Sequence, residues 1–245
     1  MAGEISLSDD MLAAICLSDH VAKEGGEHLA IRCFEGIKAE PVMDLRSGHL
    51  AGREYLSLLS TVTRAESFFH HQSATALTEL FLLHLLLSQA QNSVRRYINL
   101  PVRVLLLDGL CTELCRHDLR GVGVEIQDVE ELDKPGLSGR ECLRRNLYRL
   151  IQCGAEIYAD DVPPDQILSL RSLCLPLSGV KISRGDFLRL LSENGSGLWS
   201  QGYHQLAPAI VVEGVETPEQ YLIAAMSGAS FGQGYLWPAG VWYFR

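Results

Sequence analysis

The sequence predicts an α/β fold, a TIM-like (β/α)8 barrel of the kind that typically takes about 250 residues as one domain. The chain has 245 residues, close to that length. Short β-type runs alternate with amphipathic helical stretches along it, which favours a parallel sheet covered by helices. Eight candidate strands favour closure of that sheet into a barrel, and an open doubly wound sheet is the structural alternative.

The predicted strands are short apolar runs that carry a polar residue at or near their ends. They are Glu40–Met43, Ala51–Tyr55, Arg96–Leu100, Val122–Ile126, Glu156–Ala159, Gly179–Ile182, Ala209–Val212 and Phe231–Tyr235. The main predicted helices between them cover 74–91, 138–152, 184–194 and 217–227.

The first residues predict a separate helical segment. Residues 8–24 carry capping side chains at their start, an apolar stripe that includes Met11, Leu12 and Ile15, and a glycine pair at their end. We therefore expect a helical N-terminal extension over residues 1–35 and the barrel domain over residues 36–245.

Composition and charge limit the function classes. The formal net charge is −9, which disfavours wrapping of duplex DNA because phosphate contacts need lysine and arginine. A small anionic ligand remains compatible if metal ions neutralise it locally. The most apolar stretch, 76–90, is shorter than the about 20 residues of a membrane span. The seven cysteines and an acidic start without a secretory signal favour reduced thiols and a cytoplasmic protein.

Polar residues at the strand ends are the candidate functional site. In such barrels the active-site groups lie at the C-terminal ends of the strands, so these residues are expected to meet at one mouth. Five carboxylates would repel one another unless cations lay between them, and oxygen ligands suit Mg²⁺ or Mn²⁺. Each carboxylate alone could instead be a solvated loop residue or a helix cap. The set is Glu54, Asn99, Glu125, Asp160, Asp161, Lys181, Glu213 and Gln233.

Several segments resemble motifs of the EAL domain family, the cyclic di-GMP phosphodiesterases of bacteria. Val212–Thr217 resembles the family's AEGVET, and Gln233–Leu236 follows at the family's spacing and is similar to QGYLF. Weaker matches in the same order cover about residues 38 to 240. They include Pro41–Leu45, Glu54–Leu56 for EAL, Asn99–Pro101, Val124–Asp128 for LEITE, Asp160-Asp161 and Lys181–Ser183 for KID.

This resemblance implies a reaction and a set of roles. It implies hydrolysis of cyclic di-GMP to the linear dinucleotide at a site with two Mg²⁺ or Mn²⁺ ions. Glu54, Asn99, Glu125 and Asp160 would hold one metal, and Asp160, Asp161 and Glu213 the second. Lys181, Glu213 and Glu54 would be catalytic, and Gln233, Glu216 and Asp128 would contact or support the substrate.

The departures from the family pattern put ligand binding in question. Leu58 replaces an arginine expected to pair with a ligand phosphate. The loop after Asp161 has two prolines and no glycine, so it cannot adopt the backbone of a glycine loop. Asp128 is one methylene shorter than the glutamate expected to anchor that loop. Ser183 replaces an aspartate and Glu40 replaces a glutamine.

Three functions therefore remain open on the sequence. The first is a working phosphodiesterase, because the expected metal ligands are chemically competent. The second is a degenerate EAL module that binds cyclic di-GMP or a regulatory protein without catalysis. The third is an unrelated barrel enzyme. A homodimer is possible, although the family's dimer helices lie beside the altered loop.

Overall fold

The computed structural model describes residues 2–5, 34–59, 65–89, 93–194 and 199–244. The helix predicted over 8–24 lies outside these residues. The predicted extension is therefore described only at β1 (Ala2–Ile5) and at the start of β2 (Phe34–Asp44). The division of the chain at residue 35 stays a prediction.

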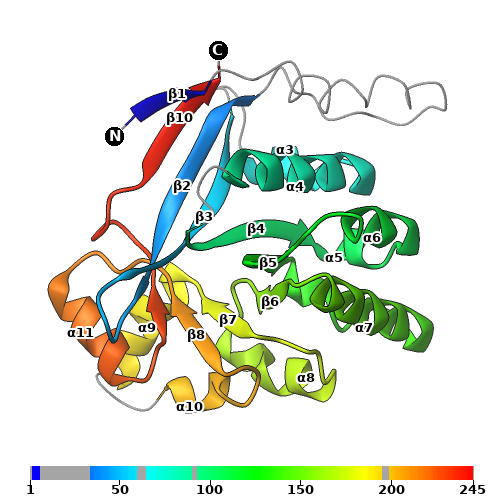
Figure 1. Cartoon of the computed structure of the whole chain (residues 1–245). Helices are drawn as coiled ribbons and strands as arrows, with labels where there is room; N and C mark the ends of the chain where they lie inside the picture. The colour runs from blue at the N-terminus through cyan, green and yellow to red at the C-terminus, as the bar shows by residue number, and fades with distance from the viewer. Residues whose placement is uncertain (1, 6–33, 60–64, 90–92, 195–198, 245) are drawn as a thin grey trace.

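A closed barrel forms the centre of the fold, as the sequence predicts (Figure 1). Neighbouring strands pair in chain order, and β2 pairs with β9 to close the ring. The ladder between β4 and β5 joins six residue pairs, whereas that between β2 and β9 joins only Met43 to Gly232 and Asp44 to Phe231. The strands after β2 are β3 (Leu50–Leu59), β4 (Arg95–Pro101), β5 (Val122–Gln127), β6 (Glu156–Ala159), β7 (Gly179–Ile182), β8 (Ala209–Val212) and β9 (Phe231–Gly232).

One strand departs from the expected parallel sheet. β2 runs antiparallel to both β3 and β9. The reason lies in the connection to β3, which spans only residues 45–49, whereas a parallel crossover needs a dozen or more residues. The Asp44 carboxylate fixes this turn by accepting hydrogen bonds from the backbone N–H groups of Arg46 (2.9 Å) and Ser47 (2.8 Å).

Two further strands extend the sheet beyond the barrel. β10 (Gly240–Phe244) pairs antiparallel with β2, and β1 pairs parallel with β10. Both described ends of the chain therefore lie together at one edge (Figure 1). Neither strand was predicted, although the run Val241–Phe244 has the β-branched and aromatic residues that favour strands.

The helices that cover the barrel match the predicted stretches closely. α11 begins with a capping box, in which Thr217 Oγ1 accepts a hydrogen bond from the backbone N–H of Gln220 (3.2 Å). No helix in the described part of the chain is long and apolar enough to span a membrane. The predicted helices are α4 (Ala74–Ser88), α7 (Leu137–Gln152), α9 (Arg184–Asn194) and α11 (Pro218–Met226). Short helices that the sequence did not predict are α3 (Ala65–His70), α5 (Val102–Leu105), α6 (Asp108–Leu114), α8 (Ile167–Ser172), α10 (Ser200–Tyr203) and the 3-10 turns η4 (Val129–Glu131) and η5 (Pro164–Gln166).

Alternating tyrosines and glycines fill the barrel interior below the strand ends. The rings of Tyr97 and Tyr158 meet edge to face with centroids 5.0 Å apart, and both side chains are buried. A Cβ atom on Gly123 would lie 2.6 Å from Tyr97 Cδ1, and one on Gly179 would lie 2.3 Å from Tyr158 Cε1. The rings therefore occupy space that the glycines leave free. Around β3 to β7 the order is Gly52, Tyr97, Gly123, Tyr158 and Gly179.

The replacement Gly123→Ala is expected to destabilise the protein by about 1–3 kcal/mol, because the added methyl group overpacks the tyrosine layer. Denaturant unfolding measures this change. Gly109→Ala is the matched control, since a Cβ atom there meets nothing within 4 Å and alanine favours helix α6. Equal stability of the two variants would contradict the proposed packing.

Candidate metal centre at the barrel mouth

The polar residues predicted at the strand ends meet at one end of the barrel. Five of them lie two positions after a residue of the layer of tyrosines and glycines, so the alternation of the strand points both side chains inward. Thus Glu54 follows Gly52 in β3, and Asn99 follows Tyr97 in β4. The others are Glu125 in β5, Asp160 and Asp161 after β6, Lys181 in β7, Glu213 after β8 and Gln233 after β9.

Lys181 is the centre of this group. Its Nζ lies 2.8 Å from Glu213 Oε1, 3.1 Å from Asp160 Oδ1, 3.2 Å from Glu125 Oε2 and 3.3 Å from Glu54 Oε2. The side chain is only 1% exposed. Burial alone would lower the pKa of Lys181, but the four carboxyl groups outweigh burial and hold that pKa well above its usual value. Lys181 is therefore a buried cation.

Two amides hold Glu54 in place. Asn99 Nδ2 donates to Glu54 Oε1 (3.0 Å), and Gln233 Nε2 donates to Glu54 Oε2 (2.7 Å) and to Glu40 Oε2 (2.8 Å). Burial raises the pKa of Glu54, but Lys181 and the amide donors outweigh burial and lower that pKa to about 2. Glu54 is consequently an ionised carboxylate with both oxygens fixed.

The remaining carboxyl groups have too little positive charge around them. Burial, together with the charge of Glu54, raises the pKa of Glu125 well above its usual value. Burial is also the largest cause that raises the pKa of Asp160 to about 6 and that of Glu213 to about 7. One ammonium group does not neutralise this cluster near neutral pH, so a divalent cation would replace bound protons.

The donor atoms fit such a cation. One oxygen each from Asp160, Asp161 and Glu213 lies within 4.8 Å of the others. Among the described residues, Asn99 Oδ1 and Gln233 Oε1 are buried acceptors that receive no hydrogen bond, and Asp160 Oδ1 has its ion pair with Lys181 but no hydrogen bond. Oxygen donors of this kind suit Mg²⁺, Mn²⁺ or Ca²⁺. The assignment of individual ligands to two metals stays a prediction.

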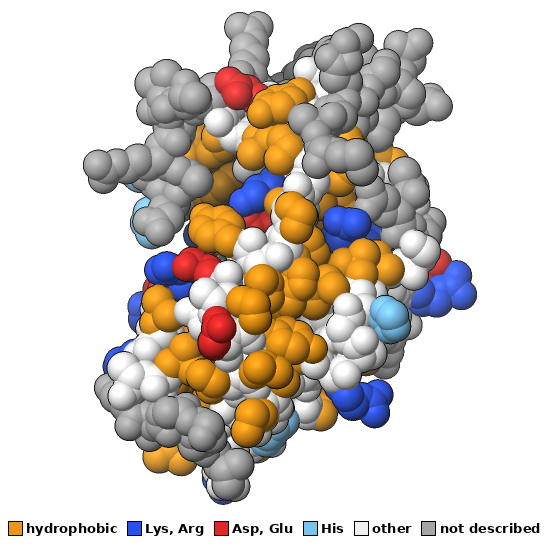
Figure 2. Space-filling view, turned by 90° about the vertical axis from the view of Figure 1, so that its left-hand side faces the viewer, with side chains coloured by type: hydrophobic (Ala, Val, Ile, Leu, Met, Phe, Trp, Pro, Cys, Tyr) orange, Lys and Arg blue, Asp and Glu red, His pale blue; other side chains and the backbone are white. Residues whose placement is uncertain are grey.

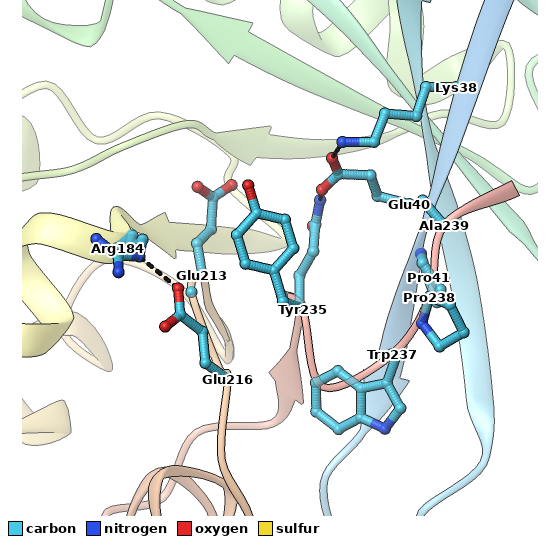
Figure 3. A pocket seen from close by; sticks show the side chains of 13 residues that line it. Lys38, Glu40, Pro41, Arg184, Glu213, Glu216, Tyr235, Trp237, Pro238 and Ala239 are labelled. Atoms are coloured by element: carbon cyan, nitrogen blue, oxygen red, sulfur yellow. Dashed lines mark hydrogen bonds and ion pairs between the residues drawn. The ribbon is translucent and has the colours of Figure 1, made fainter. Parts of the chain in front are cut away.

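A pocket of about 590 Å³ opens beside this centre and includes Glu213 and Gln233 in its lining. Figure 3 shows Glu213 and Tyr235 pointing into it, with Lys38 and Glu40 on one side and Arg184 on the other. The remaining lining residues are Pro41, Gly214, Glu216, Gly234, Trp237, Pro238 and Ala239.

Acids and bases on the pocket walls are paired. Lys38 Nζ donates to Glu40 Oε1, and Arg184 Nε donates to Glu216 Oε1 (2.8 Å). The pocket thus has a basic side chain paired with a carboxylate on each of two sides, and aromatic rings from the segment after β9.

Hydrophobic side chains lie open around this side of the molecule. Figure 2 turns the face with α11 and β10 toward the viewer, and many hydrophobic side chains are visible on it. The large exposed hydrophobic residues include Leu222 and Met226 on α11. Tyr235, in the pocket lining, is 81% exposed. The ring of Tyr235 is therefore an exposed aromatic surface at the edge of the pocket.

Asp128 lies apart from this pocket. It lines a second pocket of about 530 Å³, where its Oδ2 lies 3.8 Å from Arg103 Nη1. The substrate role assigned to Asp128 by resemblance stays a prediction. Ser183 has a local role, because its Oγ accepts the backbone N–H of Asp186 (3.1 Å) in the first turn of α9.

The loop after β6 is held firmly despite its altered sequence. Asp161 has a φ of 72°, in the left-handed region that aspartate tolerates better than most residues. Val162 is buried, its backbone N–H donates to the carbonyl of Lys181 (2.9 Å), and its own carbonyl accepts from Tyr203 Oη (3.1 Å). These contacts fix Asp160 and Asp161 beside Lys181 without glycine.

Lys38, Arg184, Tyr235 and Trp237 were not proposed as site residues from the sequence. Lys38 had a usable signal, since it lies two positions before Glu40 in a strand and shares its face. Arg184 directly follows the Lys181–Ser183 segment, and Tyr235 lies two positions after Gln233.

The sequence matches no protein-family model and no curated protein. Solved structures do match. An EAL domain protein from Listeria monocytogenes is 21% identical with a TM-score of 0.66, over 85% of this chain and 89% of that one. The FimX EAL domain from Pseudomonas aeruginosa, bound to cyclic di-GMP, is 18% identical with a TM-score of 0.67, over 94% and 96%. BlrP1 from Klebsiella pneumoniae, in complex with calcium and cyclic di-GMP, is 17% identical with a TM-score of 0.67, over 96% and 66%. The chain therefore has the fold of EAL domains.

Replacement of Glu213 by glutamine is expected to stabilise the metal-free protein at pH 8 and to change it little at pH 5. The folded-state pKa of Glu213 is raised from 4.5 to about 7, so its stabilising effect is complete below pH 4.5 and is lost as pH rises through 7. Glutamine stays neutral throughout. The gain at pH 8 should be about 1–3 kcal/mol, measured by denaturant unfolding with a chelator present.

The matched control for this variant is Glu113→Gln, which removes a carboxylate from an exposed ion pair with Arg116. It should differ little from the parent at either pH. A Glu213→Gln variant that is less stable than the parent at pH 8 would show that the surroundings of Glu213 already balance its negative charge.

Proposed function

We propose that this EAL-like domain binds divalent cations at the barrel mouth and hydrolyses one phosphodiester bond of cyclic di-GMP, giving the linear dinucleotide. The observation that carries the proposal is the cluster of Glu54, Glu125, Asp160 and Glu213 around one lysine, with buried acceptor oxygens that lack donors. Two of the similar structures contain cyclic di-GMP, which supports this choice of substrate.

The site residues would have the following roles. Glu54, Asn99, Glu125 and Asp160 would hold one Mg²⁺ or Mn²⁺, and Asp160 with Asp161 and Glu213 the other. When bound, such ions polarise a phosphoryl oxygen and lower the pKa of water.

The chain's own groups would then orient and balance charge. Gln233 fixes one oxygen of Glu54 and Asn99 the other, so this carboxylate needs no reorganisation. The buried ammonium group of Lys181 would stabilise negative charge that develops on the phosphoryl group. Glu216, held by Arg184, would contact the substrate from the pocket wall.

Binding without turnover is the second candidate, and the position of Asp128 favours it. Asp128, which by resemblance would support the substrate, lines a different pocket. There its Oδ2 lies 3.8 Å from Arg103 Nη1. A domain of this kind would sense cyclic di-GMP or bind a regulatory protein. Homodimer formation and a cytoplasmic location stay predictions.

Purified protein with Mn²⁺ or Mg²⁺ is expected to convert cyclic di-GMP to the linear product. Chromatography of the reaction mixture measures this conversion. Glu54→Ala should abolish product formation, because it removes a fixed ligand oxygen pair from the centre of the cluster. Glu113→Ala, on an exposed surface pair, should leave the rate unchanged. Absence of product with either metal at high protein concentration, with binding of cyclic di-GMP in Ca²⁺, would favour the second candidate.

A further inference from the structure

Lys38 lies on the same face of β2 as the residues of the metal centre. In the ladder between β2 and β3, Glu40 pairs with Glu54 and Lys38 pairs with Leu56. Because side chains two apart in a strand share a face, Lys38 is placed one step outward from Glu40 on the pocket wall. It is among the residues that line the pocket.

We propose that Lys38 binds a phosphate group of the ligand in this pocket. The proposal rests on the proposed function, in that the ligand is a cyclic dinucleotide, and it assigns to Lys38 a phosphate contact outside the metal centre. Glu40 and Gln233 lie between Lys38 and Glu54 in an unbroken series of hydrogen bonds. The ammonium group therefore contacts the ligand beyond the carboxylate cluster.

The contacts of Lys38 leave it able to take a ligand. Its side chain is 31% exposed. An ammonium group has three N–H donors, and the hydrogen bond to Glu40 Oε1 uses one of them. Glu40 is itself held, because its Oε2 accepts from Gln233 Nε2 at 2.8 Å. Glu40 thus orients Lys38 while two donors remain for a phosphate.

The charges around the pocket make this cation important for an anion. The lining contains three carboxyl groups, those of Glu40, Glu213 and Glu216, and two basic groups, those of Lys38 and Arg184. Arg184 is paired with Glu216 on the opposite wall. On the wall formed by β2 and β3, Leu56 and Leu58 are the neighbours of Lys38 across the ladder and are uncharged. A phosphate on that wall depends on Lys38 for a positive partner.

The ladder also provides a rescue position. Leu58 pairs with Gly36, so it is the diagonal neighbour of Lys38 on the same face. Diagonal neighbours in an antiparallel pair lie about 7–8 Å apart, within reach of a long side chain. An arginine at position 58 can consequently bring a guanidinium group to the same wall.

The test is calorimetric titration of cyclic di-GMP into the full chain with Ca²⁺ present. Lys38→Met should weaken binding roughly 10- to 100-fold, as expected for loss of a charge-assisted hydrogen bond. Lys38→Arg should bind within a few-fold of the parent. The double variant Lys38→Met with Leu58→Arg should recover most of the lost affinity. Lys134→Met, which removes a surface lysine paired with Glu131, should bind like the parent.

The outcomes separate the two proposals. Parent protein that binds, together with Lys38→Met that binds equally well, would overturn the role of Lys38 and leave the proposed function standing. A parent protein that gives no heat of binding would overturn both. Thermal unfolding of each variant distinguishes a lost phosphate contact from a lost fold. If Lys38→Met is folded and binds weakly, and adding Leu58→Arg does not restore its affinity, the result counts against the contact.

Discussion

The buried ammonium group of Lys181 is the interaction on which the barrel mouth depends. It lies within 3.3 Å of four carboxyl groups from four different strand ends. Without this cation, the carboxyl groups at the ends of β3, β5, β6 and β8 would share one buried space mainly as neutral acids, because burial and mutual repulsion disfavour their charged forms. Yet one positive charge cannot neutralise four carboxylates, which is why the same arrangement suits divalent cations. The structural and the chemical roles of the centre thus have a single electrostatic origin.

The layer of tyrosines and glycines beneath the centre determines where its side chains point. Each strand from β3 to β7 supplies an inward residue to the layer and, two positions later, a polar residue to the mouth. Tyr97 precedes Asn99 and Tyr158 precedes Asp160 in this way. Because the rings fill the interior, the polar side chains above them pack against a close-packed layer and cannot move deeper into the barrel. Packing in the lower layer therefore positions the donor atoms in the upper one.

Much of this arrangement could be predicted from local sequence patterns, and the rest could not for identifiable reasons. Strand ends carry their polar residues visibly, so Glu54, Lys181 and Glu213 could be found without a structure. The antiparallel direction of β2 follows from the short turn to β3. The short spacing is visible in the sequence, but the alternation of strands and helices along the rest of the chain favours an all-parallel sheet. Lys38 had a local signal in its spacing from Glu40, but its place on the pocket wall also depends on the pairing of β2 with β3. The location of Asp128 in another pocket depends on its contact with Arg103, which is distant in sequence.

The closure of the barrel between β2 and β9 has a mechanical consequence. Only two residue pairs join these strands, and just beyond them Gln233 from one side donates to Glu40 from the other at 2.8 Å. This side-chain hydrogen bond reinforces the junction that closes the ring, and the same two residues lie between Lys38 and Glu54. If β2 and β9 separate transiently, the pocket wall moves relative to the carboxylate cluster. A ligand that contacts residues of both β2 and β9 would hold the two strands together. Occupancy of the mouth and rigidity of the whole barrel would then rise together.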